Sequence, residues 1–239
     1  MIPKKIHYIW LGKNKKPNLV NICINSWKEK LADYELIEWN EDNINLAQIA
    51  ENNKFFKECQ KRKLWAYMAD YLRLYILYTE GGIYLDTDVQ VLKPFDDLLE
   101  DRCFIGYEAK EYIGTGVIGA EKGSKAIKSF LDFYDIEIWY SKLFTIPQII
   151  TDIVKKIPDL DIKIYPQTFF APYNPYDEYY DPDIKKETYC IHWYNAGWTT
   201  NPAVRNFLEV KHIHNTFVRA FVIFRKNVRY LLRKLVSKT

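Results

Sequence analysis

Residues 64–93 contain the feature that most restricts how this chain can fold. From Leu64 to Thr79 the only charged side chains are Asp70 and Arg73. A helix that is apolar on all sides is typical of a protein interior, so the pattern predicts a buried helix over about 61–79. Buried charges persist when they are paired or hold a ligand, and residues three apart on a helix can touch. This helix therefore predicts either an internal ion pair or two charges that face a polar ligand.

The helix leads into a glycine turn and then into a short strand that ends in two acids. Gly81-Gly82 can adopt the positive φ that ends a helix, and the apolar strand 83–86 follows. Because side chains alternate along a strand, Asp86 and Asp88 should point the same way. A D-x-D alone is common in surface loops, but two carboxylates after a buried strand suit Mg²⁺ or Mn²⁺ bound to a diphosphate.

Alternating strands and helices predict an α/β sheet that binds ligands at the carboxyl ends of its strands. The predicted strands are 4–11, 34–39, 83–86, 104–107, 112–120, 162–165 and 188–193. The predicted helices are 18–31, 43–59, 61–79, 124–140 and 147–157, and helical spacing returns from about 202. We divide the chain into a body, residues 1–209, and a helical tail, residues 210–239.

The tail is basic and the body is acidic. Of 34 Lys and Arg residues, eight lie in 210–239, which has no Asp or Glu. The body therefore has 26 basic and 31 acidic residues, a net charge of −5, against +3 for the whole chain. This asymmetry argues against a nucleic-acid binder. The tail has the spacing of a basic amphipathic helix, which can lie on an anionic membrane surface or pack its apolar face onto the body.

The cellular location is predicted from the cysteines and from the apolar segments. The four cysteines form no C-x-x-C and no disulfide-framework spacing, which indicates buried thiols in a reducing compartment. The start of the sequence lacks the apolar region of a signal peptide, and no run of 18 apolar residues occurs. We expect a cytoplasmic protein, peripheral on the inner face of the cell membrane if the tail docks there.

Three motifs together resemble glycosyltransferase family 32, the DXD-containing sugar transferases that include capsule and lipopolysaccharide enzymes. They are A-D-x-x-R at 69–73, G-G-I-Y-L-D-T-D at 81–88, and the opening I-P-K-K-I-H-Y-I-W-L-G at 2–12, followed by Ser26-Trp27. The same block is similar to the catalytic domains of the large clostridial glucosylating toxins. The resemblance implies a GT-A-type (Rossmann-like) fold in residues 1–209, a nucleotide-sugar donor, a divalent metal (Mn²⁺ or Mg²⁺) and retention of anomeric configuration.

The resemblance also implies roles for individual residues. The catalytic set would be Asp70, Arg73, Asp86 and Asp88, with Asp88 on the metal and Asp86 close to it. Tyr84 would contact the donor, and Trp10 would stack on the nucleotide base, unless it is a core aromatic on the first strand.

A second group of site residues lies further along the chain. His192, Asn195 and Trp198 match a His-containing segment of the family, although Ala196-Gly197 departs from the usual Gly-Ser-Trp ending. His192 and Asn195 could complete the metal shell, and the Trp198 indole could donate to a phosphate. The loop 114–119 resembles the family's loop beneath the donor sugar and offers Thr115 and Gly116, where relatives often have Asn.

These assignments predict a metal-dependent retaining glycosyltransferase that moves a hexose from a UDP-sugar to a glycan or lipid-linked glycan acceptor in bacterial surface polysaccharide synthesis. Two alternatives are left open. The D-T-D-V segment also resembles the nucleophile motif of haloacid-dehalogenase phosphatases, which place it close to the N-terminus and need a later Lys and an acidic pair. A non-catalytic carbohydrate-binding or membrane-docking protein could instead use the 19 Tyr and 7 Trp.

Overall fold

The computed structural model describes residues 1–173, 184–195 and 202–236. Its strands are β1 (Lys5–Ile9), β2 (Glu35–Trp39), β3 (Gly82–Leu85), β4 (Val89–Val91), β5 (Cys103–Ala109), β6 (Tyr112–Ala120), β7 (Lys163–Tyr165) and β8 (Cys190–His192). Its helices are α1 (Asn18–Lys30), α2 (Leu46–Asn52), α3 (Lys54–Lys61), α4 (Trp65–Glu80), α5 (Lys125–Asp135), α6 (Ile146–Lys156), α7 (Gln167–Phe170), α8 (Pro202–Val210) and α9 (Thr216–Val236), with 3₁₀ turns η1 (Asp96–Leu98) and η2 (Glu137–Trp139).

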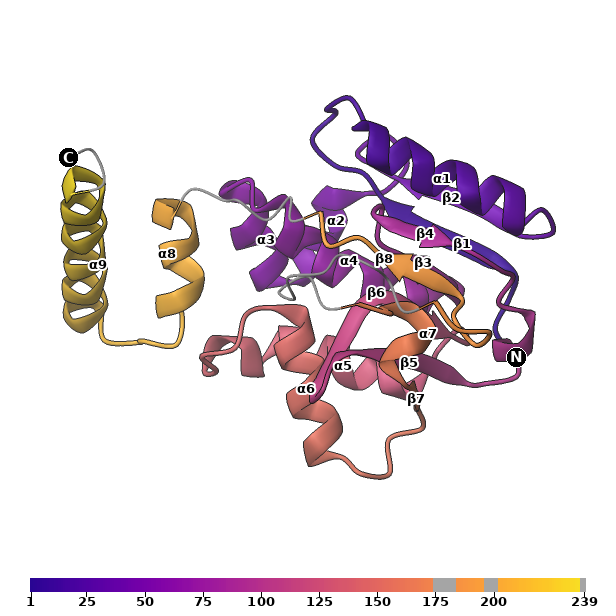
Figure 1. The fold of residues 1–239 in the computed structure, drawn as a ribbon. Coiled ribbons are helices and arrows are strands. Elements are labelled where there is room, and N and C mark those ends of the chain that lie inside the picture. The colour runs from indigo at the N-terminus through magenta and orange to yellow at the C-terminus, as the bar shows by residue number, and fades with distance from the viewer. Residues whose placement is uncertain (174–183, 196–201, 237–239) are drawn as a thin grey trace.

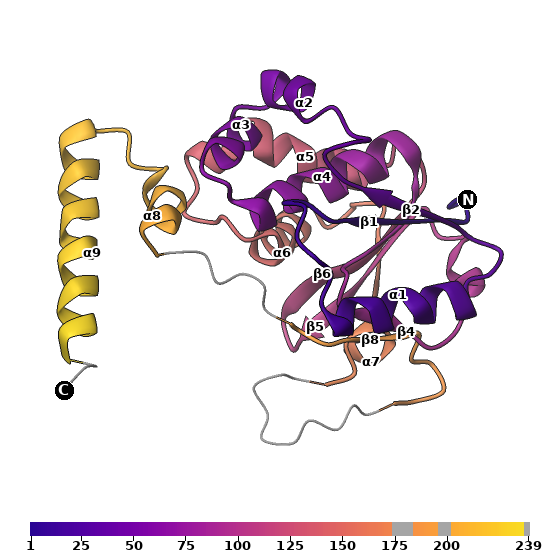
Figure 2. The same cartoon turned by 90° about the horizontal axis from the view of Figure 1, so that it is seen from above.

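A six-stranded sheet in the order β2-β1-β3-β6-β5-β7 forms the centre of the molecule, and β4 and β8 form a second, small sheet (Figure 1). β1 is parallel to both β2 and β3, whereas β6 runs antiparallel to β3 and β5. Helix α1 covers one face of the large sheet, and α4, α5 and α6 cover the other (Figure 2). The predicted α/β class is confirmed, and β3 lies in the interior of the sheet.

The alternation of side chains along β3 divides the core into two. Ile83 and Leu85 pack in the cluster that contains α1, whereas Tyr84 packs in the cluster that contains α4, α5 and α6. A strand that is buried on both faces in this way has an apolar sequence throughout. All four residues of β3 are buried, so the end of this strand is held firmly from both sides.

Helix α4 is the buried helix that the sequence predicted, but it begins later than expected. Within it Asp70 and Arg73 are only 0% and 2% exposed. The predicted start at residue 61 is wrong because α3 extends to Lys61 and Lys63 has a φ of +54°. That left-handed conformation separates the two helices.

The Gly81-Gly82 turn is fixed by a buried histidine. His7 donates from Nε2 to the Gly81 carbonyl at 2.7 Å and accepts at Nδ1 from the Trp39 indole at 3.1 Å. Gly82 has a φ of +115°, and a Cβ there would lie 2.8 Å from both His7 Nε2 and the Lys5 carbonyl oxygen. The turn therefore accepts only glycine, and it sets the direction in which β3 leaves α4.

Replacing Gly82 with alanine should lower the free energy of unfolding by about 2–4 kcal/mol, since the positive φ and the close contact both add strain. Gly123→Ala is the matched control, because Gly123 has a φ of +73° but open space around its Cα. It should cost about 1–2 kcal/mol for the backbone alone. Equal losses in urea denaturation of the two variants would show that the contact with His7 and Lys5 contributes nothing.

Candidate active site

The two acids of the D-x-D motif lie in a turn that joins β3 to β4. The Asp86 amide donates to the Gly116 carbonyl at 2.8 Å, and the Val89 amide donates to the Asp86 carbonyl at 3.0 Å. The strand ends at Leu85, so the predicted extension through Asp86 is wrong. The two carboxylates still come together, but this turn, not strand alternation, brings them there.

The short strand β4 places this turn against a histidine from far along the chain. β4 pairs antiparallel with β8, with Val89 opposite His192. Helix α1 holds β4 from the other side: the Trp27 indole donates to the Val89 carbonyl at 2.7 Å, and the Val91 amide donates to Ser26 Oγ at 3.0 Å. The Ser26-Trp27 pair is therefore a support for the strand that follows the acids.

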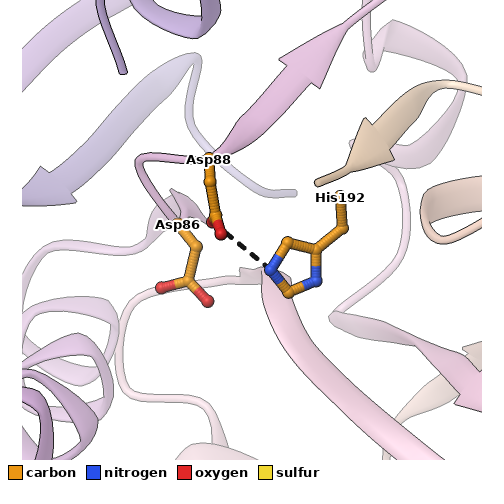
Figure 3. A group of neighbouring side chains, drawn as sticks. All are labelled: Asp86, Asp88 and His192. Atoms are coloured by element: carbon orange, nitrogen blue, oxygen red, sulfur yellow. Dashed lines mark ion pairs between the residues drawn. The ribbon is translucent and has the colours of Figure 1, made fainter. Parts of the chain in front are cut away.

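Asp86, Asp88 and His192 form a compact group that could hold a metal ion (Figure 3). One potential ligand atom from each lies within 4.8 Å of the others, and His192 Nε2 is 3.3 Å from Asp88 Oδ1. A Cβ on Gly116 would lie 3.1 Å from the His192 ring and 3.4 Å from Asp86 Oδ2. Glycine at 116 therefore leaves the space in which these groups approach one another.

The chemistry of this group fits a divalent cation. Two carboxylate oxygens and an imidazole nitrogen are ligands that Mn²⁺ and related metals accept. Burial alone would raise the pKa of Asp88, but the neighbouring His192 and two backbone amides outweigh it and lower that pKa. Burial would likewise lower the pKa of His192, and the carboxylate of Asp88 reverses this and raises it. These opposite shifts show that a protonated His192 and an ionised Asp88 stabilise each other. A bound metal ion would take the place of the proton on His192.

Asn195 contacts the site through its backbone. Its amide donates to Asp88 Oδ2 at 2.8 Å, and the Trp193 amide donates to the Asp88 carbonyl at 3.0 Å. The side chain of Asn195 is exposed. Its place in the metal shell stays a prediction, whereas its contact with Asp88 is shown. Trp198 lies outside the described residues.

Arg73 joins the buried helix to the D-x-D turn. Its guanidinium contacts Asp70 Oδ1 at 2.9 Å, Asp86 Oδ1 at 3.1 Å and the Thr115 carbonyl at 2.8 Å, and it lies 4.6 Å from the centre of the Tyr84 ring. The internal ion pair, one of the two alternatives that the sequence left open, is present, and a role of these two charges toward a ligand stays a prediction. Arg73 pairs with Asp70 inside the core and fixes Asp86 at its edge.

Asp70 and Tyr84 complete this network. The hydroxyl of the buried Tyr84 donates to Asp86 Oδ1 at 3.0 Å, and its contact with the nucleotide-sugar donor stays a prediction. Asp70 Oδ2 has no hydrogen-bond partner among the described residues. Burial, which outweighs the attraction of Arg73, raises the pKa of Asp70 to about 7. An unpaired buried carboxylate oxygen is costly, and a backbone hydrogen bond from Ile146 only partly offsets the effect of burial on this pKa.

The other residues that the resemblance assigns to the nucleotide-sugar donor differ in their exposure to solvent. Thr115 is only 4% exposed and reaches the network through its carbonyl. Trp10 is half-buried; its indole donates to the Asn14 carbonyl at 2.8 Å, and the ammonium of Lys16 lies 5.6 Å from its ring centre. Trp10 packs at the edge of the α1-side core with part of its ring exposed, and its stacking on the nucleotide base stays a prediction.

Glu108 is a site residue that the sequence did not indicate. The pairing of β5 with β6 shifts between Tyr107 and Ala109, which leaves Glu108 as the extra residue of a bulge. Bulges turn a side chain out of its regular direction and are common beside active sites. Glu108 lines a narrow pocket together with Gly116 and His192. An irregularity of pairing has no period in the sequence, so no pattern could have revealed it.

Glycine at 114 makes room for this carboxylate, because a Cβ there would lie 3.1 Å from Glu108 Oε2. Burial raises the pKa of Glu108 to about 7, and the nearby His192 only partly offsets this. Since the folded-state pKa is above that of the unfolded chain, the folded protein binds more protons between the two values. Stability is therefore highest below the unfolded pKa and falls as the pH rises through about 7.

Between pH about 5 and about 8, the free energy of unfolding of Glu108→Gln should fall by about 2 kcal/mol less than that of the wild type. Urea denaturation of the metal-free protein across that range measures it. Glu111→Gln, an exposed residue of the same hairpin, is the control and should leave the pH dependence unchanged. If the stability of Glu108→Gln depended on pH as that of the wild type does, burial would not be raising the pKa of Glu108.

Comparison with known proteins agrees with this geometry. Residues 17–105 match the family described as the glycosyltransferase sugar-binding region containing a DXD motif. An uncharacterized glycosyltransferase of Acanthamoeba polyphaga mimivirus is 24% identical over 231 residues, which cover 89% of this chain and 90% of that protein. Inositol phosphoceramide mannosyltransferase 3 of Schizosaccharomyces pombe is 30% identical over 122 residues, 51% of this chain and 34% of that protein. The chain thus spans about a third of this fungal relative.

Among solved structures, the PaToxG glycosyltransferase has a similar fold, with a TM-score of 0.51 and 20% identity over 66% of this chain and 70% of that one. The predicted GT-A-type architecture is confirmed. The matched region and the fold favour a glycosyltransferase over a haloacid-dehalogenase phosphatase.

Proposed function

We propose that this glycosyltransferase, whose residues 17–105 match the DXD-containing sugar-binding region, transfers a hexose from a UDP-sugar to a glycan acceptor, with a divalent metal and with retention of anomeric configuration. One observation supports this most strongly. The turn after β3 gathers Asp86, Asp88 and His192 within 4.8 Å, directly beside the buried pair of Asp70 and Arg73.

Asp86, Asp88 and His192 would hold the cation. When bound, it supplies a positive charge that stabilises the departing diphosphate. The surrounding residues orient these ligands: Arg73 and Tyr84 fix the Asp86 carboxylate, and backbone amides fix Asp88. Such outer contacts hold ligands in place before the substrate arrives.

Two carboxyl groups suit the hydroxyl groups of a donor sugar. Asp70 has an unpaired oxygen, and Glu108 lies in the pocket that also contains His192. Hydrogen bonds from sugar hydroxyls to such carboxyl oxygens would position the donor, and positioning of both substrates is a large part of catalysis in transfer reactions. No side chain in the described part of the site is assigned as a nucleophile, so an enzyme-bound intermediate forms no part of this proposal.

The acceptor is proposed to be a glycan or a lipid-linked glycan of a bacterial surface polysaccharide. The name of the similar fungal protein, an inositol phosphoceramide mannosyltransferase, includes a hexose and a lipid. That supports a hexose donor and an acceptor with a lipid part. The name of the fungal protein does not give the base of the nucleotide, so the donors to be tested include GDP-mannose.

Hydrolysis of a panel of UDP-glucose, UDP-galactose, UDP-N-acetylglucosamine and GDP-mannose tests the proposal. We expect turnover of a UDP-hexose in the presence of Mn²⁺ and its loss with EDTA. Full activity in EDTA would contradict metal dependence. Turnover of GDP-mannose alone would contradict the UDP assignment while leaving the site intact.

A further inference from the structure

Helix α9 lies at one side of the molecule, with α8 between it and the body (Figures 1 and 2). Two of its polar residues contact α8: Asn227 accepts from Asn206 Nδ2 at 2.8 Å, and Lys226 pairs with Glu209. A groove of about 810 Å³ is lined by residues of α3, η2, α8 and α9, and Phe207 of α8 packs against Trp139 of η2. The side of α9 that faces the rest of the protein is thus largely polar.

The apolar stripe of α9 is exposed. Phe217, Phe221 and Phe224 are 87%, 59% and 65% exposed. They are spaced i, i+4 and i+7, so they lie on one face of the helix, and the same spacing continues in the sequence at Val228 and Leu235. These three side chains therefore do not pack onto the body. Exposed large apolar residues arranged in one patch mark an interaction surface.

Basic residues flank this stripe. Arg219, Arg225, Lys226 and Arg229 occupy the other faces of α9 within its described side chains, and the guanidinium of Arg225 lies 5.9 Å from the centre of the Phe221 ring. Residues 210–239 contain no acid at all. Arg225 and Arg229 follow the stripe along one side, whereas Lys226, which pairs with Glu209, lies on the opposite face. A phenylalanine stripe with cations beside it is the pattern of a helix that lies in the interface of an anionic bilayer, with its rings among the acyl chains and its cations at the lipid headgroups.

We propose that α9 docks on an anionic lipid bilayer through Phe217, Phe221 and Phe224. The charge favours this partner: two copies of α9 packed stripe to stripe would bring their cations together, whereas anionic headgroups attract them. Among the described helices none is long and apolar enough to cross a membrane, so the contact is at the interface. If the proposed function holds, docking would bring the active site to lipid-linked acceptors, but vesicle binding itself does not depend on catalysis.

The test is co-sedimentation of the full chain with vesicles of phosphatidylcholine, alone or mixed with phosphatidylserine. We expect binding to the mixed vesicles only, and its loss as the salt rises from about 0.1 M to about 1 M. Phe217→Ser/Phe221→Ser/Phe224→Ser should abolish binding. Arg225→Gln/Arg229→Gln should weaken it by about ten- to thirty-fold.

Two controls keep the result interpretable. Ile22→Ser/Ile136→Ser removes exposed apolar side chains from the body, 53% and 67% exposed, and should leave vesicle binding unchanged. Nucleotide binding by the triple phenylalanine variant should also stay normal, which separates a docking defect from a failure of the active site. Equal binding to neutral vesicles, or retained binding by the triple variant, would overturn the proposal. Self-association that this variant abolishes, without vesicle binding by the wild type, would overturn it in favour of an interface between copies.

Discussion

Asp88→Asn should reduce sugar transfer by about a thousandfold while the protein stays folded. The substitution removes one of the two carboxylates in the group of Asp86, Asp88 and His192, and an amide oxygen is a much weaker metal ligand than a carboxylate. Asp88 lies in a turn and its carboxylate pairs with His192, so replacing it by an isosteric amide should lower the free energy of unfolding by about 1–3 kcal/mol.

Steady-state turnover with Mn²⁺ and the best donor measures this effect, and urea denaturation checks the fold. Asp42→Asn is a suitable control, because Asp42 pairs with Lys13 on the surface with its side chain 75% exposed. That variant should turn over like the wild type. Normal turnover by Asp88→Asn would remove the basis for the assigned site.

Arg73→Met should have the largest effect on stability, a loss of about 3–5 kcal/mol, together with a loss of activity. Arg73 contacts both Asp70 and Asp86 and is 2% exposed. Without it, one carboxylate is left wholly buried and unpaired, and the other loses the contact that orients it. Arg73→Lys should recover part of the stability but little activity, because an ammonium cannot bridge both acids and the Thr115 carbonyl as a guanidinium does.

The matched control is Arg102→Met. Arg102 also contacts two carboxylates, Glu121 and Asp161, but its side chain is 65% exposed, so its loss should cost about 1 kcal/mol or less. Unfolding transitions in urea compare the two. If Arg73→Met and Arg102→Met unfolded alike, the buried network would not hold the site together.

The part of the site that the sequence predicted rests on local signals. The apolar run with Asp70 and Arg73 indicated a buried helix because a helix that is buried on all sides needs apolar residues at nearly every position. The Gly-Gly turn and the acids after it are adjacent in the chain, so their proximity follows from the backbone. The resemblance to family 32 added His192, which spacing alone could not connect to Asp88.

What the sequence missed depends on contacts between distant segments. Strand β4 is three residues long and is defined by its pairing with β8, about a hundred residues later. The direction of Glu108 depends on a bulge, and the short helix α7 has too few residues to show a period. The tail illustrates the same limit: its spacing predicted an apolar stripe, but only the positions of Phe217, Phe221 and Phe224 in the structure show that the stripe faces outward.

The central claim is that Asp86, Asp88 and His192 form a metal site for a nucleotide diphosphate. Isothermal titration of the protein with UDP, with and without Mn²⁺, tests it most directly, with GDP as the comparison for the base. We expect UDP to bind at least about tenfold more tightly with Mn²⁺ than without it, and we expect Asp88→Asn to lose this difference. Nucleotide affinity that is the same with and without Mn²⁺ would contradict it.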